Sequence, residues 1–258
     1  MDTLQWHIQI GHGIDIERLE PGPRKGRVPR DGYLRACSLE FGNIPALCEK
    51  DLNFNAAMSI ARDRTVVTPV RLMNLFMLMA FYLPKIAPGH IVEFGSYKGG
   101  SALFMAYLAA RFLPNTRVFA FDTFTGMPET DGGADIHKPG DFSDANVESL
   151  REYARALELT NIEFIAGPFE DTAPNALSRI EKVALAHIDC DIYSAVRFSY
   201  DVSKPHLVDG AYVVFDDPLP SSCMGAFEAV EDCVIARDGL RAEQVFPHLV
   251  FRYPPVTG

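Results

Sequence analysis

The fold is decided by residues 90–122, HIVEFGSYKGGSALFMAYLAARFLPNTRVFAFD. The short apolar run HIVEF (90–94) ends at a glycine, and the apolar segment SALFMAYLAARFL (101–113) has the length and composition of a buried helix. A second apolar run, RVFAFD (117–122), follows it. Because short apolar strands that alternate with helices are typical of parallel sheets covered on both faces, this stretch predicts a strand–helix–strand unit.

The same alternation continues toward the C-terminus. It predicts further strands at NIEFIAG (161–167), VALAHID (183–189) and AYVVFDD (211–217), and helices at 143–159, 194–204 and 226–237. The tail EQVFPHLVFRYP predicts two short strands that meet near Pro247. The apolar stretch LMNLFMLMAFYL (72–83) is shorter than the roughly 20 residues of a membrane span, so it predicts a buried helix. The expected fold is a doubly wound α/β domain.

The length, charge and cysteine content of the chain limit the kinds of protein that it could be. The chain has 258 residues, 48% of them hydrophobic, and its 24 Lys and Arg against 34 Asp and Glu give a net charge of −10. This length can bury a core, and the acidic balance argues against nucleic acid as the main partner. The five cysteines are odd in number and form no CxxC pair, which favours a reducing compartment over a disulfide framework. The N-terminus shows no targeting signal, so we expect a soluble, cytoplasmic protein without membrane contact.

The pattern changes near residue 65. We expect residues 1–64 to form an N-terminal extension that contacts the acceptor or a second copy of the chain, and residues 65–258 to form the main domain. Within the extension, PGPRKGRVPRDG (21–32) gathers four basic side chains. This stretch is interpreted either as a solvated loop or as a patch that attracts an anionic substrate or seals a partner subunit.

Acidic side chains stand at the ends of the expected strands, where ligands of such sheets bind. The glycine-rich turn after the first strand is not the dinucleotide fingerprint GxGxxG, because Tyr97 occupies the place of the second glycine. Asp122 could accept both ribose hydroxyls of an adenosyl ligand, and Glu93 could receive the amino group of an amino-acid moiety. These two acids favour S-adenosylmethionine over a pyrophosphate cofactor, whose negative charge they would repel.

A second acidic set is expected at two neighbouring strand ends. Asp189 ends one strand, and Asp216 and Asp217 end the next, so a divalent ion could lie between them. Carboxylate oxygens with open water positions suit Mg²⁺. The alternative is a set of solvated acids at the starts of loops. Asp191 either shares the side of Asp189 or caps the helix expected from residue 194.

Five segments resemble the macrocin O-methyltransferase family: IVEFGSYKGGSALFMA, FDTFTGMPE, GPFEDTAP, HIDCDIYSA and VVFDD, in this order and spacing. The resemblance covers about residues 62–237. It implies a class I methyltransferase with a Rossmann-like, mostly parallel seven-stranded sheet. It also implies an S-adenosylmethionine- and magnesium-dependent enzyme, a homodimer by analogy, that methylates a sugar hydroxyl of a small-molecule acceptor in antibiotic biosynthesis.

The resemblance also implies roles for individual residues. The implied cofactor contacts are Glu93, Gly95, Ser96, Tyr97, Ser101, Asp122, Thr123, Phe124, Phe169, Glu170 and Asp189. The implied magnesium ligands are Asp189, Asp216 and Asp217, with Asp189 as the general base. Two segments depart from the family pattern, namely GSYKGG, where many relatives have a Trp-Arg pair, and PLPSSCMG after Asp217, which lacks a tyrosine-containing turn. Ile192 stands where catechol methyltransferases carry a lysine base, which favours an aliphatic hydroxyl as acceptor.

Other interpretations remain open. His187 is expected to be a buried core histidine, and Cys190 and Tyr193 are expected to pack. His137 lies in a long segment, 126–141, that could close over the acceptor as a lid, although a loop histidine is more often simply exposed. Two alternative functions are a metal-dependent glycosyltransferase, because Asp189-Cys190-Asp191 is a DxD pattern, and a non-catalytic cofactor-binding module.

Overall fold

The computed structural model describes residues 47–130, 132–218 and 222–255. By compactness the chain divides into two units, residues 1–55 and residues 56–258, and the second unit is described below. The basic stretch 21–32 and most of the expected extension lie outside the described residues. The role of residues 1–64 therefore stays a prediction.

The described residues form one seven-stranded sheet with the strand order β3-β2-β1-β4-β5-β7-β6. The strands are β1 (His90–Phe94), β2 (Val118–Asp122), β3 (Ile162–Ala166), β4 (Val183–Ile188), β5 (Leu207–Phe215), β6 (Ala242–Gln244) and β7 (Leu249–Arg252). The first five strands pair in parallel, whereas β7 is antiparallel to both β5 and β6. The predicted doubly wound, mostly parallel sheet is confirmed, and its switch point lies between β1 and β4.

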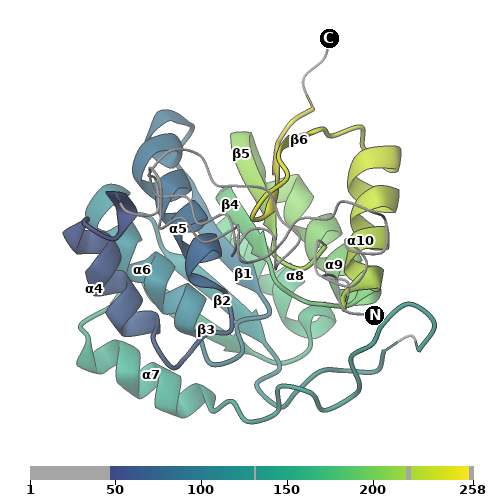
Figure 1. Ribbon diagram of the computed structural model, residues 1–258, viewed down its shortest axis with the longest axis horizontal. Coiled ribbons are helices and arrows are strands. Elements are labelled where there is room, and N and C mark those ends of the chain that lie inside the picture. The colour runs from purple at the N-terminus through teal and green to yellow at the C-terminus, as the bar shows by residue number, and fades with distance from the viewer. Residues whose placement is uncertain (1–46, 131, 219–221, 256–258) are drawn as a thin grey trace, which may run out of the picture. The chain divides into compact units, whose positions relative to one another are not determined.

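Helices cover both faces of this sheet (Figure 1). Helices on one side are α5 (Pro69–Met77), α6 (Gly100–Phe112) and α7 (Val147–Ala156), and those on the other are α8 (Phe169–Ile180), α9 (Tyr193–Ser203) and α10 (Met224–Ala229). The chain enters the described region through α4 (Leu52–Ala61). Because the first five strands of this three-layer arrangement are parallel, their carboxyl ends lie at the same edge of the sheet.

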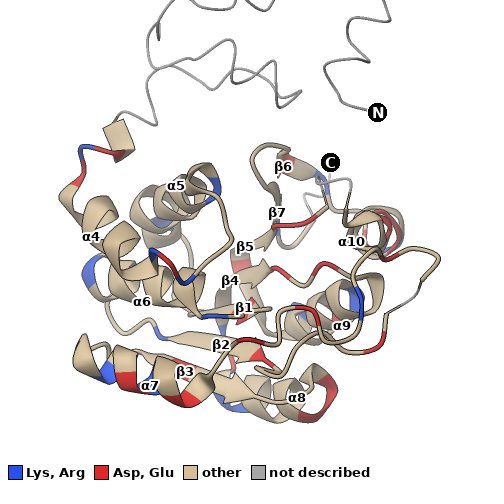
Figure 2. Cartoon of the chain, turned by 60° about the horizontal axis from the view of Figure 1, so that its bottom comes forward, with Lys and Arg blue, Asp and Glu red and all other residues tan. Residues whose placement is uncertain are grey.

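The core forms because both sides of the central strands are apolar. Phe94, Phe121 and Phe215 are fully buried, and the rings of Phe94 and Phe121 stack with their centroids 4.7 Å apart. Burying a side chain of this size contributes about 1.5–3 kcal/mol relative to leaving it exposed. Helix α7 contains both acidic and basic residues (Figure 2). Among the described residues, no helix has both the length and the apolar character needed to cross a membrane.

Several helices differ from the expected ranges. Helix α7 starts at Val147, because the Asn146 side chain accepts the backbone N–H of Ser149 at 3.0 Å and caps the helix. The expected single helices at 72–83 and 226–237 each change to a π-helical stretch, at Leu78–Tyr82 and at Val230–Arg237. Both segments are helical, as predicted, and the change to π-helix within each of them was not predicted.

Candidate functional site

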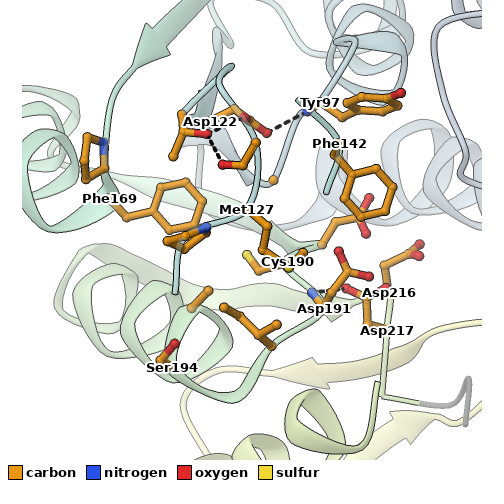
Figure 3. A pocket seen from close by; sticks show the side chains of 18 of the residues that line it. Tyr97, Asp122, Met127, Phe142, Phe169, Cys190, Asp191, Ser194, Asp216 and Asp217 are labelled. Carbon is orange, nitrogen blue, oxygen red and sulfur yellow. Dashed lines mark hydrogen bonds between the residues drawn. The ribbon is translucent and has the colours of Figure 1, made fainter. Parts of the chain in front are cut away.

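The carboxyl ends of β1, β2, β4 and β5 open into a cavity of about 430 Å³ (Figure 3). Nine of the residues expected to form the site line it: Gly95, Tyr97, Asp122, Thr123, Phe169, Glu170, Asp189, Asp216 and Asp217. Gly95 allows the strand ends to approach closely, because a Cβ atom at this position would lie 1.7 Å from the carbonyl oxygen of Asp189. Its φ of +88° also favours glycine.

Four expected cofactor contacts do not line the cavity. Glu93 is fully buried beneath it, and Ser96 and Ser101 are each 3% exposed. The Phe124 ring packs edge-to-face against Phe164 with centroids 6.3 Å apart. A direct contact of these four side chains with a ligand therefore stays a prediction.

Asp122 is held at the end of β2 by backbone donors. One carboxylate oxygen, Oδ2, accepts the N–H of Tyr97 at 2.7 Å, and the other, Oδ1, accepts the N–H of Phe124 at 2.7 Å. Burial raises the pKa of Asp122, and these two hydrogen bonds oppose that rise. The side chain faces the cavity near Tyr97 (Figure 3).

Segment 126–142, which includes the possible lid 126–141 of the sequence analysis, supplies part of the cavity wall. Met127 and Phe142 line the cavity, and the Phe142 ring packs against Tyr97 with centroids 5.2 Å apart. Arg71 of α5 and Val66 also line it. Helix α5 precedes β1 in the chain, and no motif marks Arg71, so the sequence offered no signal for it.

The three carboxylates expected to hold a metal ion do converge. Asp189, Asp216 and Asp217 each place one oxygen within 4.8 Å of the others. Burial and the charges of Asp216 and Asp217 raise the pKa of Asp189 well above its usual range. The pKa of Asp217 is raised in the same way by burial and by Asp191 and Asp216. For these two groups the effects of burial and of the neighbouring carboxylates outweigh any compensating charge, including that of Arg71 on Asp217.

Asp216 differs from its two neighbours because cationic and hydrogen-bonding groups surround it. Arg71 donates to its Oδ2, and His248 Nε2 lies 2.8 Å from its Oδ1. Burial alone would raise the pKa of Asp216, but His187 and His248 hold it well below its usual range. Asp216 is therefore an ionised, fixed carboxylate.

A chain of side-chain hydrogen bonds fixes the orientation of His248. Gln244 Nε2 donates to Asn74 Oδ1 at 2.9 Å, and Asn74 Nδ2 lies 3.0 Å from His248 Nδ1. This network assigns the acceptor role to Nδ1 and the proton to Nε2, which donates to Asp216. Burial lowers the pKa of His248 to about 4, against the opposing effect of Asp216, so the ring is neutral.

His187 is buried, as predicted for a core histidine. Its Nδ1 lies 3.0 Å from Glu93 Oε1, and its Nε2 lies 3.8 Å from Asp216 Oδ1. Burial would lower the pKa of His187, but Asp216 and Glu93 outweigh it and raise the pKa to about 9. Glu93 therefore compensates a buried imidazolium and stabilises the positive charge beside Asp216.

The residues that follow β4 take separate roles. The Cys190 thiol is buried and donates to the carbonyl oxygen of Phe94 at 3.2 Å, in agreement with its expected packing role. Asp191 lines the cavity, and its N–H donates to Asp217 Oδ2 at 2.8 Å. It does not cap α9. Instead, Asp135 Oδ1 accepts the N–H of Tyr193 at 3.2 Å.

Residues 57–242 match the family model described as Macrocin-O-methyltransferase (TylF). The chain belongs to this family. It is 31% identical over 174 residues to the 8-demethyl-8-(2,3-dimethoxy-alpha-L-rhamnosyl)-tetracenomycin-C 4'-O-methyltransferase of Streptomyces olivaceus. The matched region covers 63% of this chain and 65% of that relative, so the chain spans slightly less than two thirds of the relative's length. It is 27% identical over 182 residues to the mycinamicin III 3''-O-methyltransferase of Micromonospora griseorubida, covering 65% of this chain and 70% of that relative.

Solved structures of O-methyltransferases resemble the fold of this chain. The O-methyltransferase NovP superposes with a TM-score of 0.62 at 21% identity, covering 81% of this chain and 97% of that one. The calicheamicin methyltransferase CalS11 also has a TM-score of 0.62, at 20% identity, with 94% and 98% covered. At these identities the likeness supports the class I methyltransferase fold. Membership in an O-methyltransferase family implies S-adenosylmethionine as methyl donor, and the comparisons favour neither alternative function.

Proposed function

We propose that this protein transfers a methyl group from S-adenosylmethionine to a sugar hydroxyl of a glycosylated natural product, with the help of Mg²⁺. One observation carries this proposal: the Asp122 carboxylate and the Asp189, Asp216 and Asp217 set face the same cavity. The named activities of the relatives from Streptomyces olivaceus and Micromonospora griseorubida support an acceptor of this class. Homodimer formation and a cytoplasmic location stay predictions.

The Asp122 side chain fits the ribose of the methyl donor. Each carboxylate oxygen has two acceptor positions, and each already accepts one backbone N–H, from Tyr97 or from Phe124. Thr123 Oγ1 lies 3.5 Å from Oδ1, but its hydroxyl has a closer acceptor in the carbonyl oxygen of Gly126 at 2.7 Å. With the Thr123 proton directed at Gly126, one acceptor position per oxygen is left for the two neighbouring ribose hydroxyls. Phe169 and Glu170 line another part of the cavity and could flank the adenine. The volume of about 430 Å³ is in the range of small-molecule sites.

The acidic set fits a divalent ion with oxygen ligands. Neither Asp189 nor Asp217 forms an ion pair with Lys, Arg or His in the described part of the chain, and both have raised pKa values. A cation between them would remove this unfavourable repulsion. Bound Mg²⁺ would lower the pKa of a coordinated acceptor hydroxyl. Asp189, Asp216 and Asp217 would hold the ion, and Arg71 and His248 would keep Asp216 in place.

A carboxylate must accept the proton of the acceptor hydroxyl. Asp189 is the predicted base, but a metal ligand is a weakened proton acceptor. Asp191 is a second candidate while its own carboxylate binds no metal ion, because it lines the cavity and burial raises its pKa. Ile192 also lines the cavity, and its apolar side chain at this position supports an aliphatic rather than a catechol acceptor.

Calorimetric titration would test the proposal. S-adenosylmethionine and its demethylated product should each bind to the protein. Mg²⁺ should give a separate binding signal, and D189N should abolish that signal. Transfer of a radiolabelled methyl group to glycosylated acceptors should then require both S-adenosylmethionine and Mg²⁺. With D191N, in protein that holds Mg²⁺ as its only metal ion, a lowered kcat at unchanged Mg²⁺ affinity would identify Asp191 as the base. If neither cofactor form bound to the folded protein, the proposed methyltransferase function would be wrong.

A further inference from the structure

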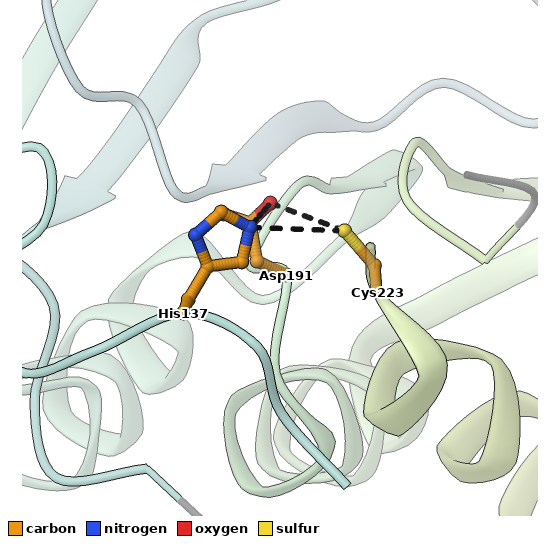
Figure 4. A group of neighbouring side chains, drawn as sticks. All are labelled: His137, Asp191 and Cys223. Atoms are coloured by element: carbon orange, nitrogen blue, oxygen red, sulfur yellow. Dashed lines mark hydrogen bonds and ion pairs between the residues drawn. The ribbon is translucent and has the colours of Figure 1, made fainter. Parts of the chain in front are cut away.

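A second group of side chains, distinct in chemistry from the acidic set, converges beside the cavity. It consists of His137 from segment 126–142, Asp191 after β4 and Cys223 just before α10 (Figure 4). His137 Nε2 lies 3.5 Å from Asp191 Oδ1, and Cys223 Sγ lies 3.5 Å from the same oxygen. The sulfur and the imidazole nitrogen are 4.0 Å apart. Three different ligand atoms therefore form a compact triangle.

The sides of this triangle match the face of a tetrahedral metal site. Zinc bonds of about 2.0–2.2 Å to nitrogen or oxygen and about 2.3 Å to sulfur, at tetrahedral angles, separate pairs of ligand atoms by about 3.3–3.6 Å. Two of the three separations are 3.5 Å, and the third is 4.0 Å. A direct hydrogen bond between imidazole and carboxylate would normally be about 2.7–3.2 Å long. The His137–Asp191 separation is thus too long for a good hydrogen bond and close to that of two ligands sharing an ion.

We propose that His137, Asp191 and Cys223 form a binding site for a divalent transition-metal ion of the zinc type. Thiolate and imidazole ligands favour such ions, whereas the oxygen-only set of Asp189, Asp216 and Asp217 favours Mg²⁺. Three protein ligands leave a fourth position for water or a bound molecule. The two sites are neighbours, because the Asp191 N–H donates to Asp217 Oδ2.

The protein holds His137 in the orientation that this site needs. Its other ring nitrogen, Nδ1, lies 3.4 Å from Asp141 Oδ2, which is an ion-pair distance and not a short hydrogen bond, and Nε2 is directed at Asp191 and Cys223. A carboxylate on the far nitrogen is the usual support of a metal-binding histidine, because it fixes the tautomer and the ring orientation. Asp141 is in turn held by the backbone N–H of Lys138, which donates to its Oδ2 at 3.0 Å.

Backbone contacts bring the histidine-bearing segment to this position. The N–H of Gly225 donates to the carbonyl oxygen of Ala134 at 3.1 Å, and Asp135 accepts the N–H of Tyr193. A Cβ atom at Gly225 would lie 2.0 Å from Asp135 Oδ1, so the segment packs directly on the start of α10. The ligand triangle is therefore built by the fold. A bound ion would also tie segment 126–142, which lines the cavity through Met127 and Phe142, to the ends of β4 and α10.

The test uses the full chain, freed of any affinity tag and stripped with a chelator, and measures Zn²⁺ and Co²⁺ binding without methyl donor. We expect one equivalent of Zn²⁺ that excess Mg²⁺ does not displace, and a Co²⁺ complex with a thiolate-to-metal charge-transfer band. Both signals should disappear in H137A and in C223S. D141N should weaken Zn²⁺ binding about 10- to 100-fold, because it removes the support of the histidine.

Matched variants distinguish this cluster from the acidic set and from thiols and imidazoles elsewhere in the chain. C233S and H206A remove a cysteine and a histidine outside the cluster, and D189N disrupts the acidic set, so all three should keep the charge-transfer band. Circular dichroism confirms that each variant is folded. The proposal is overturned if the wild-type protein shows no thiolate band, or if the band persists in folded C223S or H137A. Because no methyl donor is present, this result is independent of the proposed methyl transfer.

Discussion

Replacement of Asp122 by asparagine tests the most specific part of the donor site. The Asp122 carboxylate accepts the N–H groups of Tyr97 and Phe124, both at 2.7 Å, and keeps one acceptor position on each oxygen. In D122N one of these oxygens becomes an NH₂ group. That group cannot accept a ribose hydroxyl, and it faces a backbone N–H that then lacks an acceptor.

The size of the effect follows from these contacts. A hydrogen bond to a charged group contributes about 1.5–3 kcal/mol, and a neutral one about 0.5–1.5 kcal/mol. Losing one charged bond to ribose and weakening the other should cost about 2–4 kcal/mol of donor binding, which is about 30- to 700-fold in Kd. The unpaired N–H should also lower the free energy of unfolding by about 1–3 kcal/mol.

Calorimetry with S-adenosylhomocysteine measures the first quantity, and urea unfolding measures the second. D171N is the matched control, because Asp171 lies in the first turn of α8, is exposed and does not line the cavity. Its affinity should equal that of the wild-type protein. If folded D122N bound the ligand within about threefold of the wild-type affinity, the ribose would not lie at Asp122 and the reasoning would be refuted.

Three further predictions concern the strand ends. G95A should lower the free energy of unfolding by more than about 3 kcal/mol, because the new Cβ would lie 1.7 Å from the Asp189 carbonyl oxygen, and a loss below about 1 kcal/mol in urea unfolding would contradict this. H248F should weaken Mg²⁺ binding about 10- to 100-fold in calorimetry, since Asp216 loses the donor that orients it, and unchanged affinity would show that this support is unnecessary. Without Mg²⁺, the Tm should fall as the pH rises above about 5, because the raised pKa values of Asp189 and Asp217 make the folded state retain protons that the unfolded state releases. Mg²⁺ should raise the Tm more at high pH than at low pH, and scanning calorimetry that showed the opposite trend would exclude the ion from this set.

The central strands were predictable from sequence because their apolar character is continuous. Strand β1 has the predicted bounds, His90–Phe94, and β2 differs by one residue. Both strands are buried on two faces, so their sequences are almost wholly apolar, and the buried Glu93 is the one charged residue before the last position of β1. The adjoining glycine turn marks the start of α6 in the same way.

Helices that depend on tertiary packing were less predictable. The sequence pattern predicts no helix over residues 169–180, where Pro174 removes a backbone donor inside α8. The structure keeps this helix because Ala173, Leu177 and Ile180 bury one face of it at helical spacing. The π-helical stretch Val230–Arg237 likewise has no distinct signal in the sequence.

The residues of the site likewise fall into a group that was predictable from the sequence and a group that was not. The acids at the strand ends were predictable, because parallel strands direct their carboxyl ends to one edge of the sheet. Asn74 and His248 were not, because they lie 174 residues apart in sequence and meet only in the folded chain. The contact of His248 with Asp216 depends on the place of β7, which pairs with β5 and lies between β5 and β6, and no local pattern predicts that strand order.

The surroundings of the three metal-binding candidates differ, and that difference suggests how the site would assemble. Asp216 is already ionised, because Arg71, His187 and His248 stabilise its charge. Asp189 and Asp217 have raised pKa values and hold protons more tightly. An arriving cation would therefore meet one fixed negative charge and then displace protons from the other two. Metal affinity should accordingly rise with pH over the range in which those two groups ionise, while Asp216 remains the constant anchor.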